Sequence, residues 1–181
     1  MQTYIVLLRA VNVSGKNIIA MKDLKNLLDN ANFKQVKTYI QSGNIILQSL
    51  LDKSKVHQSI YKIIQHHFNL SIDIFVLTIN EFLDIINNNP FPYDLPHNKI
   101  YITLLSHQPE KEYINKLSQI DFGKEEYILE NNILYSYTPD GMANARITNT
   151  FIENNLKVRA TGRNRNTIVK LKDIALEFIN D

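Results

Sequence analysis

The chain shows one order of apolar patterns twice, and this repetition limits the possible folds more than any other feature. Residues 3–9 form an apolar strand pattern, and leucines at helical spacing follow in 21–31. Two strand patterns then flank the turn signal SGN at 42–44, which is typical of a hairpin. A second helical pattern at 53–68 and a strand pattern at 71–78 complete the order β-α-β-β-α-β.

The second half repeats this order with weaker signals. The segments are a strand at 99–105, a helix opening at Pro109, a hairpin turning at 131–132, a helix carrying Ile147, Phe151 and Ile152, and a short strand at 156–161. An additional helix is predicted from about Asn166, with an apolar stripe of Ile168, Leu171, Ile174, Ala175, Phe178 and Ile179. The sequence therefore predicts an α+β protein with two tandem ferredoxin-like (βαββαβ) subdomains plus a C-terminal helix.

A proline-rich stretch separates the two repeats. Residues 89–98, NPFPYDLPHN, hold three of the five prolines, which is typical of a linker. Before it, Thr78 and Glu81 match a capping box that predicts a short helix. We expect a ferredoxin-like subdomain at 1–88, a Pro-rich linker at 89–98, and a second ferredoxin-like subdomain with the extra helix at 99–181.

The composition excludes several classes of site. The chain has no cysteine, which rules out disulfide frameworks, thiolate zinc sites and cysteine nucleophiles. His66 and His67 are adjacent rather than four residues apart, so we predict no metal site, and we predict no cofactor. The first apolar run stops at Arg9, and no run has the 18 residues that a membrane span needs. We expect a cytoplasmic protein without a membrane partner; the sequence leaves the oligomeric state open.

Charge is distributed unevenly along the chain. Residues 1–72 carry nine Lys/Arg and three acids, 73–140 carry four and eleven, and 141–181 carry seven and four. Two basic flanks around an acidic middle indicate either an oriented electrostatic surface or ordinary solvated surface, and the sequence does not decide between them.

A first candidate anion site lies in the stretch ATGRNRNTIVKL at 160–171. We expect TGRNRN to form a loop that leads into the last helix, whose first amide groups carry a partial positive charge. A guanidinium can bind a phosphate or carboxylate through two donors, and Asn and Thr can cap or donate. The predicted ligand-binding residues are Arg163, Asn164, Asn166 and Thr167. In the alternative interpretation, Asn and Thr only cap the helix and the arginines form ion pairs.

A second candidate anion site lies in RAVNVSGKN, between the first strand and the first helix. The predicted ligand-binding residues are Arg9, Asn12, Gly15, Lys16 and Asn17. The Gly-Lys pair lacks the upstream glycine of a P-loop, so the sequence predicts a donor-rich loop and no nucleotide fingerprint. The alternative is a polar connection without a ligand.

Several motifs together carry a resemblance. These are YIVLLRAVNVSGKN, TYIQSGNIIL, NPFP, YSYTPDGMANARITN and ATGRNRNTIVKL. In combination they resemble the bacterial family catalogued as domain of unknown function 1697. The resemblance implies two tandem ferredoxin-like subdomains and no particular activity. The shared motif positions are those of both candidate sites together with Gln41, Ser42, Gly43 and Asn44 of the hairpin.

The chain also departs from the family pattern. The family more often has glycine where Ala10 and Ser14 stand, alanine at Gly162 and tryptophan at Arg165. It often has Ser-Lys where Ala145 and Arg146 stand. The resemblance therefore implies that Arg165 is not part of a shared anion site.

Three functions remain compatible with the sequence. The favoured hypothesis is a binding module for a phosphate-bearing anionic ligand, either nucleic acid or a nucleotide-like metabolite, because no catalytic constellation is visible beside the two donor-rich loops. The alternatives are an enzyme that acts on a small anionic substrate in the cleft between the subdomains, and a protein-interaction scaffold.

Overall fold

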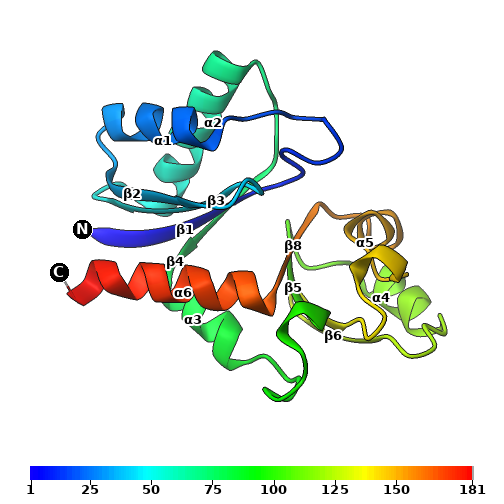
Figure 1. Ribbon diagram of the computed structural model, residues 1–181. Helices are drawn as coiled ribbons and strands as arrows, with labels where there is room; N and C mark the ends of the chain where they lie inside the picture. Colours follow the sequence, from blue (N-terminus) through cyan, green and yellow to red (C-terminus); the bar gives the residue numbers. More distant parts are fainter. Residues whose placement is uncertain (181) are drawn as a thin grey trace. The chain divides into compact units, whose positions relative to one another are not determined.

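The computed structural model describes residues 1–180, and side chains as far as Phe178, so Ile179 of the predicted apolar stripe lies outside the described side chains. The protein is of mixed α+β class, as predicted (Figure 1). Contacts divide it into two compact units, unit 1 (Met1–Asp84 and Lys170–Asp181) and unit 2 (Ile85–Val169). These limits differ from the expected ones, since the end of the last helix groups with unit 1.

Unit 1 contains a four-stranded antiparallel sheet. Its strands are β1 (Gln2–Leu8), β2 (Lys34–Tyr39), β3 (Asn44–Ser49) and β4 (Ile74–Thr78), in the order β2-β3-β1-β4. The register runs from Gln2 opposite Ser49 to Leu7 opposite Asn44. The start of β1 and the end of β3 therefore share one end of the sheet, and the β2–β3 turn lies at the other.

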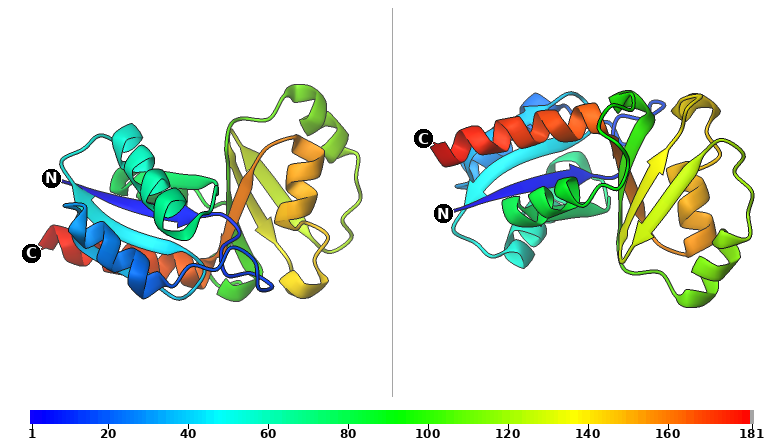
Figure 2. Two further views of the ribbon diagram at one scale, coloured as in Figure 1. Left: turned by 90° about the horizontal axis from the view of Figure 1, so that it is seen from above. Right: turned by 90° about the horizontal axis from the view of Figure 1, so that it is seen from below.

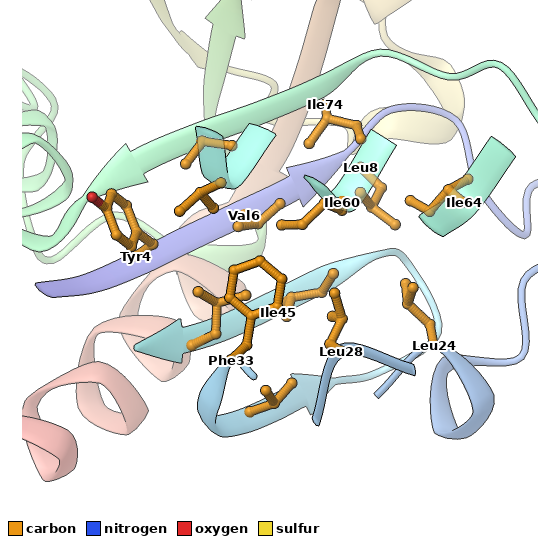
Figure 3. Close-up of a cluster of buried hydrophobic side chains, with 14 of the residues drawn as sticks. Tyr4, Val6, Leu8, Leu24, Leu28, Phe33, Ile45, Ile60, Ile64 and Ile74 are labelled. Atoms are coloured by element: carbon orange, nitrogen blue, oxygen red, sulfur yellow. The ribbon is translucent and has the colours of Figure 1, made fainter. Parts of the chain in front are cut away.

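Helices α1 (Met21–Asn30) and α2 (Lys53–Phe68) cover one face of this sheet. Alternate residues of β1 point toward them and are almost fully buried with the apolar sides of both helices (Figure 3). The labelled members of this core are Tyr4, Val6, Leu8, Leu24, Leu28, Phe33, Ile45, Ile60, Ile64 and Ile74. This burial is the main source of stability for the unit.

The opposite face of the sheet is also buried. Ile5, Leu7 and Ile46 have no more than 1% exposure. Helix α6 (Arg165–Asn180) runs along this face with its last turns, where Gln48 Nε2 donates to the Phe178 carbonyl at 3.0 Å (Figure 2). A strand buried on both sides reads as a continuous apolar run, which explains the pattern of β1.

Local signals set the limits of the helices in unit 1. The Asp52 carboxylate accepts from the Lys55 amide and caps α2. The predicted capping box of α3 (Ile79–Asn87) is confirmed: the Thr78 amide donates to Glu81 Oε2 at 2.8 Å, and the Glu81 amide donates to Thr78 Oγ1 at 3.2 Å.

Unit 2 contains a second four-stranded antiparallel sheet. Its strands are β5 (Ile100–Leu105), β6 (Glu126–Glu130), β7 (Ile133–Tyr137) and β8 (Ala160–Asn164), in the order β6-β7-β5-β8. Helices α4 (Lys111–Ser118) and α5 (Asn149–Leu156) follow β5 and β7, and short 3-10 helices occupy His97–Lys99 and Met142–Asn144. The predicted hairpin turn is confirmed, with Asn131 at φ 53°.

The prediction that TGRNRN (161–166) forms a loop is wrong. Thr161 to Asn164 belong to β8, and α6 begins directly afterwards at Arg165. Pairing with β5, where Ile102 lies opposite Arg163, outweighs the turn preference of Gly and Asn. Gly162 suits this place because a Cβ there would lie 2.9 Å from Thr103 Oγ1 and 3.0 Å from Asn149 Oδ1.

Among the described residues, no helix combines the length and the apolar character needed to cross a membrane.

Candidate functional site

Two motifs that are far apart in the sequence meet at one end of the unit 1 sheet. The loop at residues 9–20 contacts the hairpin turn at residues 40–43, and we call their joint surface the loop–turn surface. The Leu8 amide donates to the Gly43 carbonyl at 2.8 Å, and Asn12 Nδ2 donates to the Gln41 carbonyl at 2.7 Å. Both stretches belong to the motifs that carry the family resemblance.

The Asn12 side chain joins the two segments. Its Nδ2 also donates to the Ile19 carbonyl at 2.9 Å, and its Oδ1 accepts from the Ile19 amide at 2.9 Å. The residue has φ 55°, a left-handed conformation that Asn tolerates better than most residues. Asn12, predicted as a ligand-binding residue, therefore satisfies backbone groups of the loop and of the turn.

The tip of the loop is a tight turn that is fixed by further internal bonds. Asn17 Nδ2 donates to the Ala10 carbonyl at 2.9 Å, and the Asn12 amide donates to the Asn17 carbonyl at 3.1 Å. The Lys16 amide donates to the Val13 carbonyl at 2.9 Å, which closes the tip. Gly15 and Lys16 are exposed there.

Left-handed backbone is frequent in this loop. Ala10 and Ser14, which stand where the family more often has glycine, have φ 52° and 49°. An L-residue with a Cβ pays about 1–2 kcal/mol for this conformation. Glycine, which the family resemblance implies at these two positions, would adopt this conformation without that cost.

Ala10→Gly is expected to stabilise unit 1 by roughly 0.5–1 kcal/mol, because relief of the left-handed conformation exceeds the added entropy of the unfolded chain. Urea unfolding measures the difference. Ala31→Gly is a control, since Ala31 has φ −85° and is exposed, and there we expect a loss of stability. If both substitutions destabilise the protein equally, the left-handed geometry of Ala10 is contradicted.

Two cations lie in this loop. Arg9 Nη1 is 3.4 Å from Asp73 Oδ2, and their side chains are 25% and 43% exposed. The Arg9 amide also donates to the Asp73 carbonyl at 3.0 Å, so this arginine is fixed against the start of β4. Lys16 extends from the exposed tip.

The loop–turn surface also has an apolar rim. Val13, Ile18 and Ile40 are 55%, 62% and 51% exposed. The Ile19 and Gln41 carbonyls accept from the same Asn12 amide group, which brings the segments around Ile18 and Ile40 together. The sequence alone does not reveal this rim, because only the fold shows which aliphatic side chains stay outside the core.

The C-terminal candidate residues lie in unit 2, and two of the four, Arg163 and Thr167, are buried. Arg163 is 9% exposed, and its Nη1 donates to Thr161 Oγ1 and to the Gly162 carbonyl, both at 2.9 Å. Burial lowers the pKa of its guanidinium to about 10. Asn164 Oδ1 accepts from the amide of the buried Thr167 at 3.0 Å and so caps α6, while Asn166 is exposed.

Arg165 has a structural role that the sequence did not reveal. Its Nη1 donates to the Pro92 carbonyl and its Nη2 to the Phe91 carbonyl, both at 2.8 Å, and its guanidinium lies 5.7 Å from the centre of the Tyr93 ring. The residue is only 5% exposed. It anchors the proline-rich segment to the first turn of α6.

The structure therefore brings the candidate residues of the 9–17 loop together with residues 41–44 in unit 1, and places the candidate residues of 163–167 at the β8–α6 junction in unit 2. The charge blocks of the sequence do not coincide with these units. Unit 1 has eleven Lys/Arg and nine acids, and unit 2 has nine of each. Neither unit has a strong excess of positive charge, so anion binding would depend on local geometry.

Comparisons with known proteins agree with this architecture. The family model described as "Protein of unknown function (DUF1697)" matches residues 1–135. The solved structure of the conserved bacterial protein SP0830 from Streptococcus pneumoniae is similar, with a TM-score of 0.76 over 96% of this chain and 98% of that chain, at 18% identity. A likeness at this identity concerns the fold. The comparison with curated proteins gave no match. The matched stretch covers all of β1 to β6 and the whole loop–turn surface, and the chain belongs to the DUF1697 family.

Proposed function

We propose that this protein is a binding module for a phosphate-bearing anionic ligand, either nucleic acid or a nucleotide-like metabolite, and that the loop–turn surface is its contact. The observation that carries the proposal is the hydrogen-bonded tip between Val13 and Lys16. The side chains of Asn12 and Asn17, on either side of the tip, hold it through hydrogen bonds to backbone groups of the loop and of the hairpin turn. A site that is ordered before binding pays less conformational entropy when the ligand arrives.

The chemistry of the tip suits such a ligand. A Cβ built on Gly15 would meet no atom of the described residues within 4 Å, so a ligand can approach the backbone closely. Lys16 offers an exposed ammonium group, a common partner of phosphate. The rim of Val13, Ile18 and Ile40 would contact the apolar part of the same ligand, such as a sugar or a base. The hydrogen bonds of Asn164 and Thr167 serve the start of α6 and support unit 2.

We also propose that each unit has the ferredoxin-like fold. Support comes from the element order β-α-β-β-α-β in each unit and from the matching strand orders β2-β3-β1-β4 and β6-β7-β5-β8.

Lys16→Glu is expected to weaken binding of labelled single-stranded RNA, or of a phosphorylated metabolite that raises the melting temperature of the wild type, by about 10–100-fold. A charge-assisted contact is worth roughly 1.5–3 kcal/mol, and the substitution also introduces repulsion. Fluorescence anisotropy for RNA and thermal shift for metabolites measure the effect.

Lys124→Glu is the matched control, because it changes the net charge equally at an exposed lysine of unit 2. We expect it to leave binding nearly unchanged. Affinity for RNA should also fall steeply with rising salt as phosphate contacts release counterions. Equal losses in both variants, or a wild type that binds neither RNA nor any metabolite of a broad panel, contradict the proposal.

A further inference from the structure

An apolar groove lies at the other end of the unit 1 sheet from the loop–turn surface. It has a volume of about 320 Å³, and its walls include Met1, Ala31, Phe33, Lys34 and Leu50. Its rim carries large exposed apolar side chains: Leu50 is 83% exposed and Met1 66%. Exposed apolar side chains beside a groove are typical of a protein contact surface.

The backbone directly after the exposed Leu50 is held by hydrogen bonds. The Leu51 amide donates to Ser49 Oγ at 3.1 Å, and Tyr4 Oη donates to the Leu51 carbonyl at 2.8 Å. Asp52 is fixed in turn, because its Oδ1 caps α2 and its Oδ2 lies 3.1 Å from Lys55 Nζ, while its side chain remains 57% exposed. The hydrogen-bonded backbone between β3 and α2 therefore places the exposed Leu50 beside the groove.

The groove and the residues around it offer both a projecting side chain and a hollow that could receive one. Leu50 projects, and the groove beside it can receive a side chain of that size. Lys34 lies in the groove wall, whereas Asp52 lines the adjoining hollow together with Met1 and Leu50. A two-fold axis places each feature of one copy against its complement on the other, which is the requirement for an isologous dimer.

We propose that a second copy of this chain docks on this groove, with Leu50 of each copy in the groove of the other and Lys34 facing Asp52 across the contact. The contact is made by side chains and does not extend the sheet. Edge strand β2 has an irregular register between Lys34 and Lys37, with Gln35 at φ 48°, and such a bulge opposes pairing with a further strand.

Sedimentation of the full chain tests the proposal. The wild type should sediment at twice its 21.0 kDa mass, and Leu50→Glu should sediment at the mass of one chain. Ile128→Glu, a control at a 40% exposed side chain of unit 2, should remain a dimer. A wild type that sediments as one chain at the highest concentration reached, or a Leu50→Glu variant that remains a dimer, overturns the proposal.

Cross-linking tests the geometry separately, since the natural chain has no cysteine. A mixture of Leu50→Cys and Ala31→Cys chains should form a disulfide-linked pair on mild oxidation, because Leu50 of one copy enters the groove wall that holds Ala31 of the other. A mixture of Leu50→Cys and Ile128→Cys chains is the control. Equal cross-linking in both mixtures overturns the assigned contact.

Discussion

Gly43→Ala is expected to destabilise unit 1 by roughly 2–5 kcal/mol, from left-handed strain and overpacking together. The new Cβ would lie 2.5 Å from Val11 Cγ2 and 2.7 Å from Leu8 Cβ, and Gly43 has φ +74°. Leu8 Cβ is attached to a central strand and cannot move aside without the backbone. Urea unfolding followed by circular dichroism measures the loss.

Gly15→Ala separates the two causes. Gly15 has nearly the same φ, +73°, but a Cβ there meets nothing within 4 Å. We expect it to cost only about 1–2 kcal/mol, the conformational part alone. If the two variants unfold at the same urea concentration, the close packing of Gly43 against β1 and the loop does not contribute to the free energy of unfolding. The close contact between loop and turn would then be contradicted.

Arg165→Met is expected to destabilise unit 2 by roughly 3–5 kcal/mol. It removes two hydrogen bonds from a charged donor and leaves the Phe91 and Pro92 carbonyls without that partner, each bond being worth about 1.5–3 kcal/mol. The proline-rich segment should also become more accessible to proteases. Urea unfolding and limited proteolysis measure the two effects.

Arg146→Met is the matched control for this substitution. Arg146 is exposed, and its Nη1 donates to the Asp121 carbonyl. Exposed bonds contribute little, so we expect a loss of about 1 kcal/mol or less. Equal losses for the two arginines would show that the bonds of Arg165 to the proline-rich segment do not stabilise the unit.

Local patterns predicted most of the secondary structure. The order of strands and helices, the capping box of Thr78 and Glu81, and the hairpin at Asn131 all follow from neighbouring residues. The last strand was predicted at 156–161, about four residues before its actual position at Ala160–Asn164, because the composition of TGRNRN favours a turn. Its pairing with β5 joins residues about sixty positions apart, as in Ile102 with Arg163, and no local signal reports such a pairing.

The candidate site was predicted only in outline. The polar residues at 9–17 do form a connection between strand and helix, and their role in ligand binding stays a prediction. Residue types alone do not distinguish exposed donors from bonded ones: Asn12 and Asn17 donate to carbonyls within unit 1, whereas Lys16 is exposed. The turn at residues 40–43 is joined to the loop by contacts between residues far apart in the sequence. Such contacts cannot be recognised in a single sequence.

The anchor at Arg165 binds main-chain oxygens, and every amino acid supplies such an oxygen. These hydrogen bonds constrain the path of the proline-rich segment. They do not depend on which side chains stand at the two accepting positions, Phe91 and Pro92. The identity of those side chains is constrained separately: Phe91 is 8% exposed, and its ring centre lies 6.3 Å from that of Tyr137. The path of the segment and the side chains along it therefore answer to two independent constraints, main-chain hydrogen bonding for the first and packing for the second.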